Sequence, residues 1–336
     1  MLEEALSAAR VVADQEREAG PGLAALGQAL ARQAPGLALT VARGSSDHAA
    51  SYFAYLAMQR IGVPVVSLPM SLVTLHRAPL AVQGQLAVAL SQSGRSPDLV
   101  DTMVTLGGAG ARTVALVNQP DSPLAAACEW TVPLCAGAEK SVAATKSYIA
   151  SLSAVARLVA HWRDDAALLQ ALQALPEHLL AATREDWSPA VEALAKAERI
   201  MVVGRGLGFA IALEAALKFK ETCAIQAEAF SSAEIKHGPM ALIHQGYPLL
   251  VFAPRGPEQS GLIALAAEMR ERGAKVLLAA PADVPTRQLT LATAADEVLD
   301  PLLAIQSFYL MAATLSEARG LNPDAPLHLS KVTLTV

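Results

Sequence analysis

Short apolar runs alternate with longer segments of helical spacing along most of the chain. In the first half, five runs bounded by polar or turn-forming residues predict buried strands, at 37–42, 63–68, 86–90, 113–117 and 131–134. Helical periodicity over 47–60 and 97–106 predicts helices between them. This alternation is typical of an α/β fold in which a mostly parallel sheet is covered by helices on both faces.

The same pattern starts again in the second half. Further strands are predicted at 200–203, 249–252, 275–279 and 297–299, with a helix over 209–222. At equivalent strand ends, Ala-Arg-Gly-Ser-Ser (42–46) resembles Val-Gly-Arg-Gly-Leu (203–207), which suggests a duplication. We therefore expect two tandem α/β domains, each a mostly parallel sheet flanked by helices.

Composition shifts and prolines suggest where the domains end. We expect an N-terminal helical segment (1–36), a first domain (37–163), a helical connector (164–196) interrupted by Pro176 and Pro189, and a second domain (197–319). Residues 320–336 are predicted to form an irregular tail. Because the tail still carries apolar residues, we expect it to pack on the domain surface and to close the active site.

The composition excludes several classes of protein. With 53% hydrophobic and 17% charged residues among 336, the chain has enough apolar material for two cores, and disorder is excluded. A net charge of -5 without a dense basic run argues against nucleic-acid binding. No apolar stretch reaches about 18 uncharged residues and the start of the chain is acidic, so no membrane span or signal peptide is expected and a cytoplasmic protein is predicted.

Neither a disulfide framework nor a metal or nucleotide cofactor is expected. Cys128, Cys135 and Cys223 are too few and too far apart, and we interpret them as apolar fillers in a reducing compartment. No H-E-x-x-H or paired Cys/His spacing occurs. The glycines of 204–208 are spaced G-x-G-x-G, and no acidic residue follows at a strand end about 20 positions later, which argues against a nicotinamide dinucleotide.

The loop that follows the predicted strand 86–90 carries the clearest sign of a ligand. Its sequence is Ser91-Gln92-Ser93-Gly94-Arg95-Ser96. Ligands of open parallel sheets bind at the carboxyl ends of strands, where a helix N-terminus also offers unpaired N–H groups. Three serine hydroxyls would add donors, and the glycine would let the backbone approach closely, so the loop predicts a phosphate cradle. An ordinary serine N-cap is the alternative. One strand earlier, Ser45 or Ser46 could meet the same ligand.

Charged residues in the second half suggest acid–base chemistry. Spacings of four and three place Glu214, Lys218 and Glu221 on one helix face. A solvated ion pair would account for the first two, whereas the apolar residues after Glu221 suit a general base. His237 precedes a Gly-Pro turn; a lone histidine is more often structural, but a position beside a turn favours a role in a cleft.

Together these motifs resemble the sugar isomerase (SIS) family, and most closely the isomerase half of glucosamine-6-phosphate synthases and the SIS-type glucosamine-6-phosphate deaminases. The resemblance covers almost the whole chain, through six segments in the family's order: 43–47, 91–96, 139–146, 214–221, 227–239 and 329–332.

The resemblance implies two tandem SIS domains with the flavodoxin-like three-layer α/β/α fold, and it implies a role for individual residues. Glu221 matches the base that moves a proton between C1 and C2, and His237 matches the residue that helps to open the sugar ring. Lys331 matches the tail lysine that forms a Schiff base with fructose 6-phosphate in the synthases. The family histidine comes from the neighbouring subunit, which implies a homodimer. The positions implied to hold the sugar phosphate are Ser46, Ser91, Gln92, Ser93 and Ser96, with Val142 beside the sugar. Arg95 stands where the synthase loop usually has glutamate and adds positive charge beside the phosphate.

The direction of the reaction is predicted from the comparison with the synthases. Their N-terminal glutaminase domain opens with a catalytic cysteine, whereas no cysteine precedes Cys128 here and about 40 residues precede the first predicted strand. The resemblance then implies conversion of glucosamine 6-phosphate and water to fructose 6-phosphate and ammonia. The alternatives are a deglycase or isomerase of another amino-sugar phosphate, such as fructosamine or galactosamine 6-phosphate, and a non-catalytic sugar-phosphate sensor. A sensor would usually carry a helix-turn-helix segment, for which residues 1–36 are too few.

Overall fold

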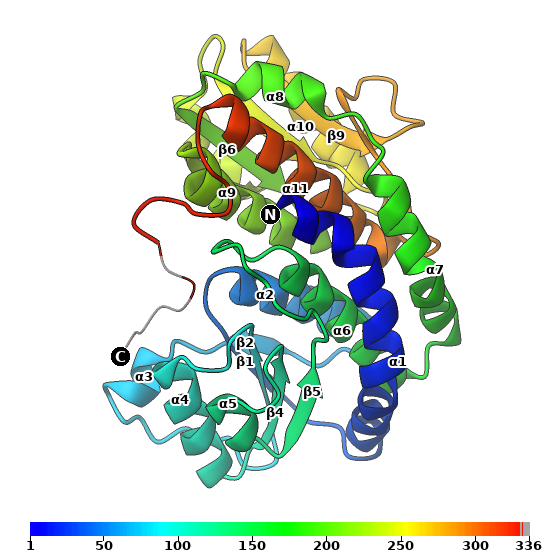
Figure 1. Ribbon diagram of the computed structural model, residues 1–336, viewed down its shortest axis with the longest axis vertical. Coiled ribbons are helices and arrows are strands. Elements are labelled where there is room, and N and C mark those ends of the chain that lie inside the picture. Colours follow the sequence, from blue (N-terminus) through cyan, green and yellow to red (C-terminus); the bar gives the residue numbers. More distant parts are fainter. Residues whose placement is uncertain (330, 332–336) are drawn as a thin grey trace. The chain divides into compact units, whose positions relative to one another are not determined.

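The computed structural model describes residues 1–329 and 331, which belong to two compact domains (Figure 1). The first domain contains Arg10–Glu139, Lys146–Gln173 and, from the tail, Lys331. The second contains Met1–Ala9, Lys140–Thr145 and Ala174–Leu329. Within the predicted tail, residues 330 and 332–336 lie outside the described residues.

Within the described residues, the sheet of the first domain has five parallel strands in the order β2-β1-β3-β4-β5. The strands are β1 (Ala38–Val41), β2 (Val65–Ser67), β3 (Leu86–Ser91), β4 (Arg112–Val117) and β5 (Trp130–Pro133). The helices that begin or lie in this domain are α2 (Gly44–Arg60), α3 (Ser71–Thr74), α4 (Pro97–Gly108), α5 (Pro123–Ala126), α6 (Lys146–Arg163) and α7 (Ala166–Ala182). Helix α1 (Leu2–Arg32) enters it from the second domain.

Both faces of the three central strands of this sheet, β1, β3 and β4, are buried, as the apolar runs predict. Every residue of β3 is buried, and alternate residues such as Ala87 and Ala89 pack against Leu99 and Met103 of α4. Strands covered on both faces have no polar side, so their sequences are almost continuously apolar. The five strands predicted in this half are confirmed.

The second domain repeats this topology. In the part that the structure describes, five parallel strands follow the order β10-β9-β8-β6-β7. Counted from the first strand of each domain, both sheets have the order 2-1-3-4-5, as in flavodoxin-like folds. Segment 42–46 follows the first strand of its sheet, and segment 203–207 begins with the last two residues of the first strand of the other sheet. The strands are β6 (Arg199–Gly204), β7 (Gln226–Ser231), β8 (Pro248–Phe252), β9 (Lys275–Pro281) and β10 (Leu289–Leu291).

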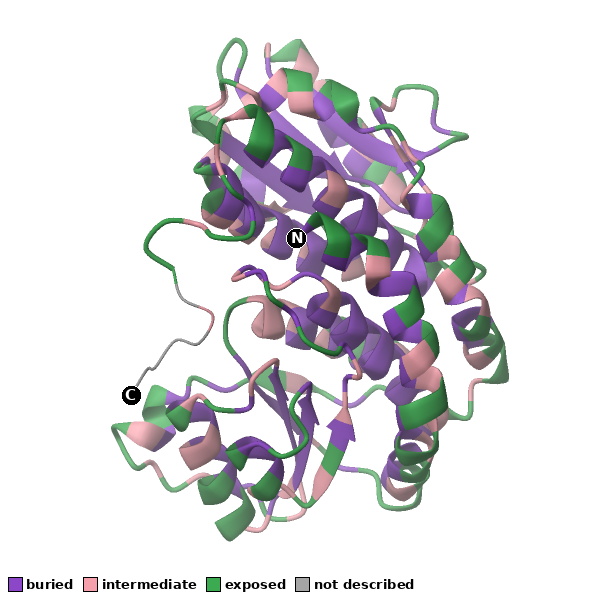
Figure 2. Ribbon diagram, in the orientation of Figure 1, coloured by how far each residue is buried: buried purple, intermediate pink, exposed green. Residues whose placement is uncertain are grey.

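Helices cover this second sheet as well. In the sheet's core, Met201 and Val251 pack with Leu262 and Met269 of α10. Figure 2 shows the strands as largely buried and the outer helix surfaces as exposed. The helical elements are α8 (Ser188–Leu194), α9 (Leu207–Cys223), η1 (Glu234–His237), η2 (Pro239–Leu242), α10 (Gln259–Glu271), η3 (Glu297–Leu299) and α11 (Asp300–Ala318), where η denotes a 3-10 helix.

Three elements of the second domain differ from the prediction. The strand predicted at 297–299 is wrong: this segment is η3, started by the Asp296 carboxylate, which accepts a hydrogen bond from the Val298 amide at 3.0 Å. Strands β7 and β10 were not predicted. Both are edge strands; β7 alternates apolar with polar residues over a short length, and β10 has three residues. An edge strand buries fewer side chains, so its apolar signal is weak.

Pro176 does not interrupt the connector helix. It lies inside α7, where it cannot donate the usual hydrogen bond to the carbonyl of Leu172. The guanidinium of Arg157, on α6, donates to that carbonyl instead, at 3.3 Å. A buried arginine therefore offsets the lost backbone bond, whereas Pro189 lies in the first turn of α8, where a missing N–H is tolerated.

Helix α11 is the core helix of the second domain. The segment Glu297–Ala318 is long and apolar enough to cross a membrane by length and composition, but 89% of its most apolar window is buried. Phe308 packs edge to face on Phe219 of α9, with ring centroids 5.1 Å apart. Packing inside the domain therefore explains the apolar character of α11.

Candidate active site

The phosphate loop turns sharply between β3 and α4. The Ser91 hydroxyl accepts a hydrogen bond from the Gly94 amide at 3.0 Å, and the Ser93 hydroxyl accepts one from the Arg95 amide at 3.3 Å. Gly94 has φ +63°, and a Cβ there would lie 2.1 Å from the Ser122 hydroxyl. Glycine is therefore required both by the backbone conformation and by the close approach to α5.

Ser96 does not serve as an ordinary helix cap. It is the N-cap residue of α4, yet its side chain makes no capping hydrogen bond. Ser122, at the start of α5, does cap its helix by accepting a bond from the Ala125 amide. The alternative of a plain serine cap is thus wrong for Ser96, whose hydroxyl remains available at the positive end of α4.

A cavity of about 320 Å³ lies at the carboxyl end of this sheet, between the loops that follow β1 and β3. This volume is at the lower end of the range of small-molecule sites. All five predicted phosphate-binding positions and Lys331 line it, together with Arg43. The lining positions from the prediction are Ser46, Ser91, Gln92, Ser93 and Ser96.

Lys331 is held in the cavity by a buried carboxylate. Its ammonium lies 3.0 Å from Glu139 Oε2, and the Glu139 side chain is fully buried. Ser147, at the start of α6, fixes that carboxylate by donating from its amide to Oε1 at 3.1 Å and from its hydroxyl to Oε2 at 2.7 Å. These contacts, from Ser147 through Glu139 to Lys331, therefore place the tail lysine within the first domain.

Glu221 lies on α9 in the second domain and is part of a charged cluster. Lys218 Nζ donates to Glu221 Oε2 at 2.5 Å and lies 3.4 Å from Glu214 Oε1. The Tyr309 hydroxyl of α11 donates to the same Glu214 oxygen at 2.9 Å. Glu214 and Lys218 are completely buried, and Glu221 keeps 22% of its side chain exposed.

The expectation of a solvated Glu214–Lys218 pair is therefore wrong. Helix α11 covers this face of α9, so the pair is a core feature. Burial by itself lowers the pKa of Lys218, but the attraction of Glu214 and Glu221 outweighs it and raises that pKa above its ordinary value. Lys218 thus stays an ammonium, and Glu221 contacts this buried charge rather than apolar neighbours alone.

The two other predicted residues of the second domain lie on different segments. Val142 is in the loop 140–145, where its amide donates to the Asp324 carbonyl at 3.2 Å. Glu4 Oε1 supports the same loop by accepting from the amides of Lys140 and Ser141 at 2.5 and 3.2 Å. His237 ends η1 and is exposed, next to Gly238 with φ +140°.

The cavity of the first domain thus brings together Lys331 and the five phosphate positions. Glu221, Val142 and His237 belong to the second domain. Sequence reasoning missed Tyr309 altogether. Positions 43, 139 and 218 lie within segments of family resemblance, and Lys218 was expected to pair with Glu214, but none of the three was assigned to a site.

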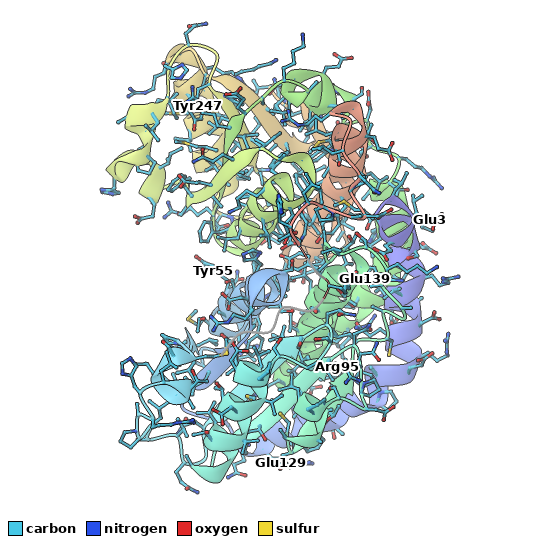
Figure 3. The ribbon with its side chains drawn as sticks, turned by 60° about the vertical axis from the view of Figure 1, so that its left-hand side comes forward. Glu3, Tyr55, Arg95, Glu129, Glu139 and Tyr247 are labelled. Atoms are coloured by element: carbon cyan, nitrogen blue, oxygen red, sulfur yellow. The ribbon has the colours of Figure 1, made fainter. Side chains whose placement is uncertain are left out.

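Metal-binding groups and arginines near the cavity bear on which ligand it could hold. Within residues 1–329 and 331, no three His, Cys, Asp or Glu side chains are grouped so that they could hold a metal ion. Figure 3 shows Glu139 and Arg95 on the ribbon with its side chains. Arg95 is exposed and does not line the cavity, whereas Arg43 does. The positive charge beside the cradle thus comes from a different arginine than the loop sequence suggested.

Comparison with known proteins defines the class of this chain. The SIS domain model matches it twice, over residues 32–160 and 193–311, and the chain therefore belongs to the SIS domain family. The two matches correspond to the two repeated sheets.

The curated relatives carry a more specific name. The chain is 34% identical over 312 residues to glutamine–fructose-6-phosphate aminotransferase (isomerizing) of Symbiobacterium thermophilum, covering 87% of this chain and 50% of that protein. The Aeropyrum pernix protein of the same name is 34% identical over 325 residues, covering 90% of this chain and 51% of that protein. The chain thus spans about half the length of the curated relatives it matches.

Solved structures have the same fold over nearly all of the chain. A Silicibacter pomeroyi protein, provisionally named a phosphosugar isomerase, superposes with TM-score 0.92 at 38% identity, covering 96% of this chain and 99% of that one. Glucosamine-6-phosphate deaminase of Thermotoga maritima superposes with TM-score 0.74 at 20% identity, covering 98% and 100%. The latter similarity concerns the fold alone.

Proposed function

We propose that this chain is a phosphosugar isomerase that acts as a glucosamine-6-phosphate deaminase, forming fructose 6-phosphate and ammonia. The observation that carries the proposal is the cavity in which Ser46, the phosphate loop and Lys331 meet at the carboxyl end of the first sheet. Amino-sugar chemistry is favoured by the relatives, whose names describe aminotransfer to fructose 6-phosphate.

The phosphate would be bound without a metal ligand. The N-terminus of α4 and the hydroxyl of Ser96 are donors for an anion, and Ser91 and Ser93 hold the loop in shape through the Gly94 and Arg95 amides. Holding the phosphate fixes one end of the open-chain sugar, which lowers the entropic cost of bringing C1 and C2 to the base.

Glu221 is the proposed base of the proton transfer. It removes the proton from C2 of the open-chain aminoaldehyde, which gives a C1–C2 enolamine, and it returns a proton to C1. The C2 imine that results takes up water and releases ammonia, leaving the C2 carbonyl of fructose 6-phosphate. Lys218, held as an ammonium between two carboxylates, keeps Glu221 oriented.

Three further assignments belong to the same proposal. His237 is exposed at the end of η1, as expected for a residue that helps to open the sugar ring from the neighbouring subunit of a homodimer. Val142 lies beside the sugar, and the tail that carries Lys331 closes the site. A cytoplasmic location fits sugar-phosphate substrates and three free cysteines.

Ammonia release from glucosamine 6-phosphate tests the activity. Galactosamine 6-phosphate and fructosamine 6-phosphate are assayed beside it, and the proposal predicts the highest kcat/KM for glucosamine 6-phosphate. Glu221→Gln should lower kcat by about 100-fold or more, because it removes the base and keeps the shape. No ammonia from glucosamine 6-phosphate, or full turnover by the variant, would refute the assignment.

Mixing two inactive variants tests the shared site. Glu221→Gln and His237→Ala homodimers should each be inactive, whereas subunit exchange makes mixed dimers with one site that contains both intact residues. At equal amounts and full exchange, about one quarter of the wild-type activity should return. If no activity returns after exchange is verified by mass, His237 does not act across an interface.

A further inference from the structure

We propose that Arg43 is the cation that recognises the phosphate dianion in this chain, and that the buried Asp98 positions it. The proposal rests on the proposed function, since it names a further residue of the same phosphate site. Arg43 is not among the positions that the family resemblance implies for phosphate binding.

Arg43 enters the cavity from the first strand of the sheet. It follows β1 as the N-cap residue of α2, with an extended backbone at φ -139°, and it lines the cavity together with Ser46 and Ser96. Two loops of neighbouring strands therefore supply the cation and the hydroxyls. This point, where the strand order reverses between β1 and β3, is where ligands of such sheets bind.

The contact with Asp98 fixes one side of the guanidinium. Arg43 Nε and Nη2 both donate to Asp98 Oδ2, at 3.1 and 2.9 Å. The Asp98 side chain is 1% exposed, whereas the Arg43 side chain is 58% exposed. Among the residues that the structure describes, Nη1 has no acceptor. An arginine that served only to neutralise Asp98 would not need to keep more than half of its side chain exposed beside a cavity lined by serine hydroxyls.

Charge balance gives the second reason for this assignment. Asp98 is the second residue of α4 and carries a negative charge at the helix N-terminus, where a phosphate would otherwise be repelled. Arg43 neutralises that carboxylate and keeps a donor for the ligand. The other cation in the cavity, Lys331, is likewise paired with a buried carboxylate, Glu139. Without Arg43, the Lys331 ammonium in the lining would face the two buried carboxylates behind it, Asp98 and Glu139, and this group of charges would be net negative before any phosphate entered.

Isothermal titration calorimetry of the full chain with inorganic phosphate and with fructose 6-phosphate tests the proposal. Arg43→Met should weaken the binding of both ligands by about 10- to 100-fold, since it removes a charge-assisted hydrogen bond. Arg95→Met is the matched control, because this exposed arginine lies in the loop but not in the cavity lining, and its affinities should stay within about twofold. Arg43→Lys keeps the charge without the two-nitrogen contact to Asp98 and should give an intermediate affinity.

The outcomes separate this inference from the proposed function. Phosphate affinity that is unchanged in Arg43→Met, with circular dichroism and melting like the wild type, overturns the role of Arg43. An equal loss in Arg95→Met also overturns it, because the effect would then be one of general charge. If Arg43→Met unfolds, the Arg43→Lys series decides in the same way. Phosphate binding that depends on Arg43 in a protein that releases no ammonia would refute the deaminase and leave this inference standing.

Discussion

Lys218→Met is expected to destabilise the second domain more than a double variant that removes the charges of both Lys218 and Glu214. The lysine and Glu214 are both completely buried, and their charged atoms are 3.4 Å apart. Methionine has a similar length and no charge, so the variant leaves the Glu214 carboxylate buried without this cation, while the Tyr309 hydroxyl still donates to it at 2.9 Å.

The size of the effect follows from the geometry. With an effective dielectric constant of about 20, charges at this separation attract each other by about 5 kcal/mol, which roughly offsets the cost of removing them from water. The intact pair therefore adds little net stability. Removal of one partner leaves the desolvation cost of the other uncompensated, and this typically lowers the free energy of unfolding by about 3–5 kcal/mol.

Urea unfolding and hydrogen exchange provide the measurement. We expect Lys218→Met to lose about 3–5 kcal/mol, with faster amide exchange in α9 and α11 than elsewhere. The double variant Glu214→Gln/Lys218→Met carries no unpaired charge at these two positions, and it should recover at least about 1.5 kcal/mol of that loss. A single variant within about 1 kcal/mol of the wild type, or a double variant as unstable as the single, would show that burial does not govern this cluster.

The same cluster predicts the alkaline limit of stability. The pKa of Lys218 in the folded domain is raised above its ordinary value of 10.5. Its contribution to stability is therefore complete below that pH and is lost as the pH rises through the raised pKa. Above about pH 10.5 the wild type should lose stability more steeply than the double variant, and parallel pH curves for the two proteins would contradict the assignment.

Three further predictions concern the cavity. Gly94→Ala should weaken phosphate binding at least about tenfold, because its Cβ would meet Ser122, whereas Gly62→Ala, also at positive φ but with open space around it, should cost only about 1 kcal/mol and leave the affinity unchanged. Ser96→Ala should weaken phosphate binding with little effect on melting, whereas Ser122→Ala, which removes a helix cap, should cost about 1 kcal/mol. Glu139→Gln keeps the contacts to Ser147 but removes the ionic partner of Lys331; kcat should fall by about tenfold or more, whereas Ser147→Ala should reduce it less. Titration calorimetry, thermal melting and the ammonia assay check these three, and equal effects in each pair of variants would contradict them.

What could be predicted from the sequence is local. The buried strands of both sheets stand out because apolar residues fill both of their faces, and the phosphate loop stands out because a glycine and three serines follow one such strand. The predicted helices are found in the structure with ends that differ by a few residues. Strand β7 was missed because only Ala227 is buried among its six residues.

The missed features are contacts between distant parts of the chain. Arg43 and Asp98 are 55 residues apart, Glu214 and Tyr309 are 95 apart, and Glu139 and Lys331 are 192 apart. Spacing on one helix can show that Glu214 and Lys218 share a face, but not that α11 covers it. Long-range packing decides which charged residues become buried, and no pattern of nearby residues contains that information.

The repeated topology raises the question of whether the second domain also binds a phosphate, and its loops argue against this. The segment after β8, which corresponds to the phosphate loop, is Ala-Pro-Arg-Gly-Pro-Glu (253–258) and has no hydroxyl. Its arginine, Arg255, is engaged by both Asp300 oxygens, each at 2.8 Å. A Cβ on Gly206, in the loop after the first strand of this sheet, would lie 2.4 Å from Glu258 Oε1, so a carboxylate of the protein occupies the place of an anion. We therefore expect calorimetric titration with fructose 6-phosphate to give one site per chain. Glu258 would repel a phosphate dianion bound in the second domain. A titration that gave two equivalent sites per chain would therefore refute the conclusion that the second domain does not bind phosphate.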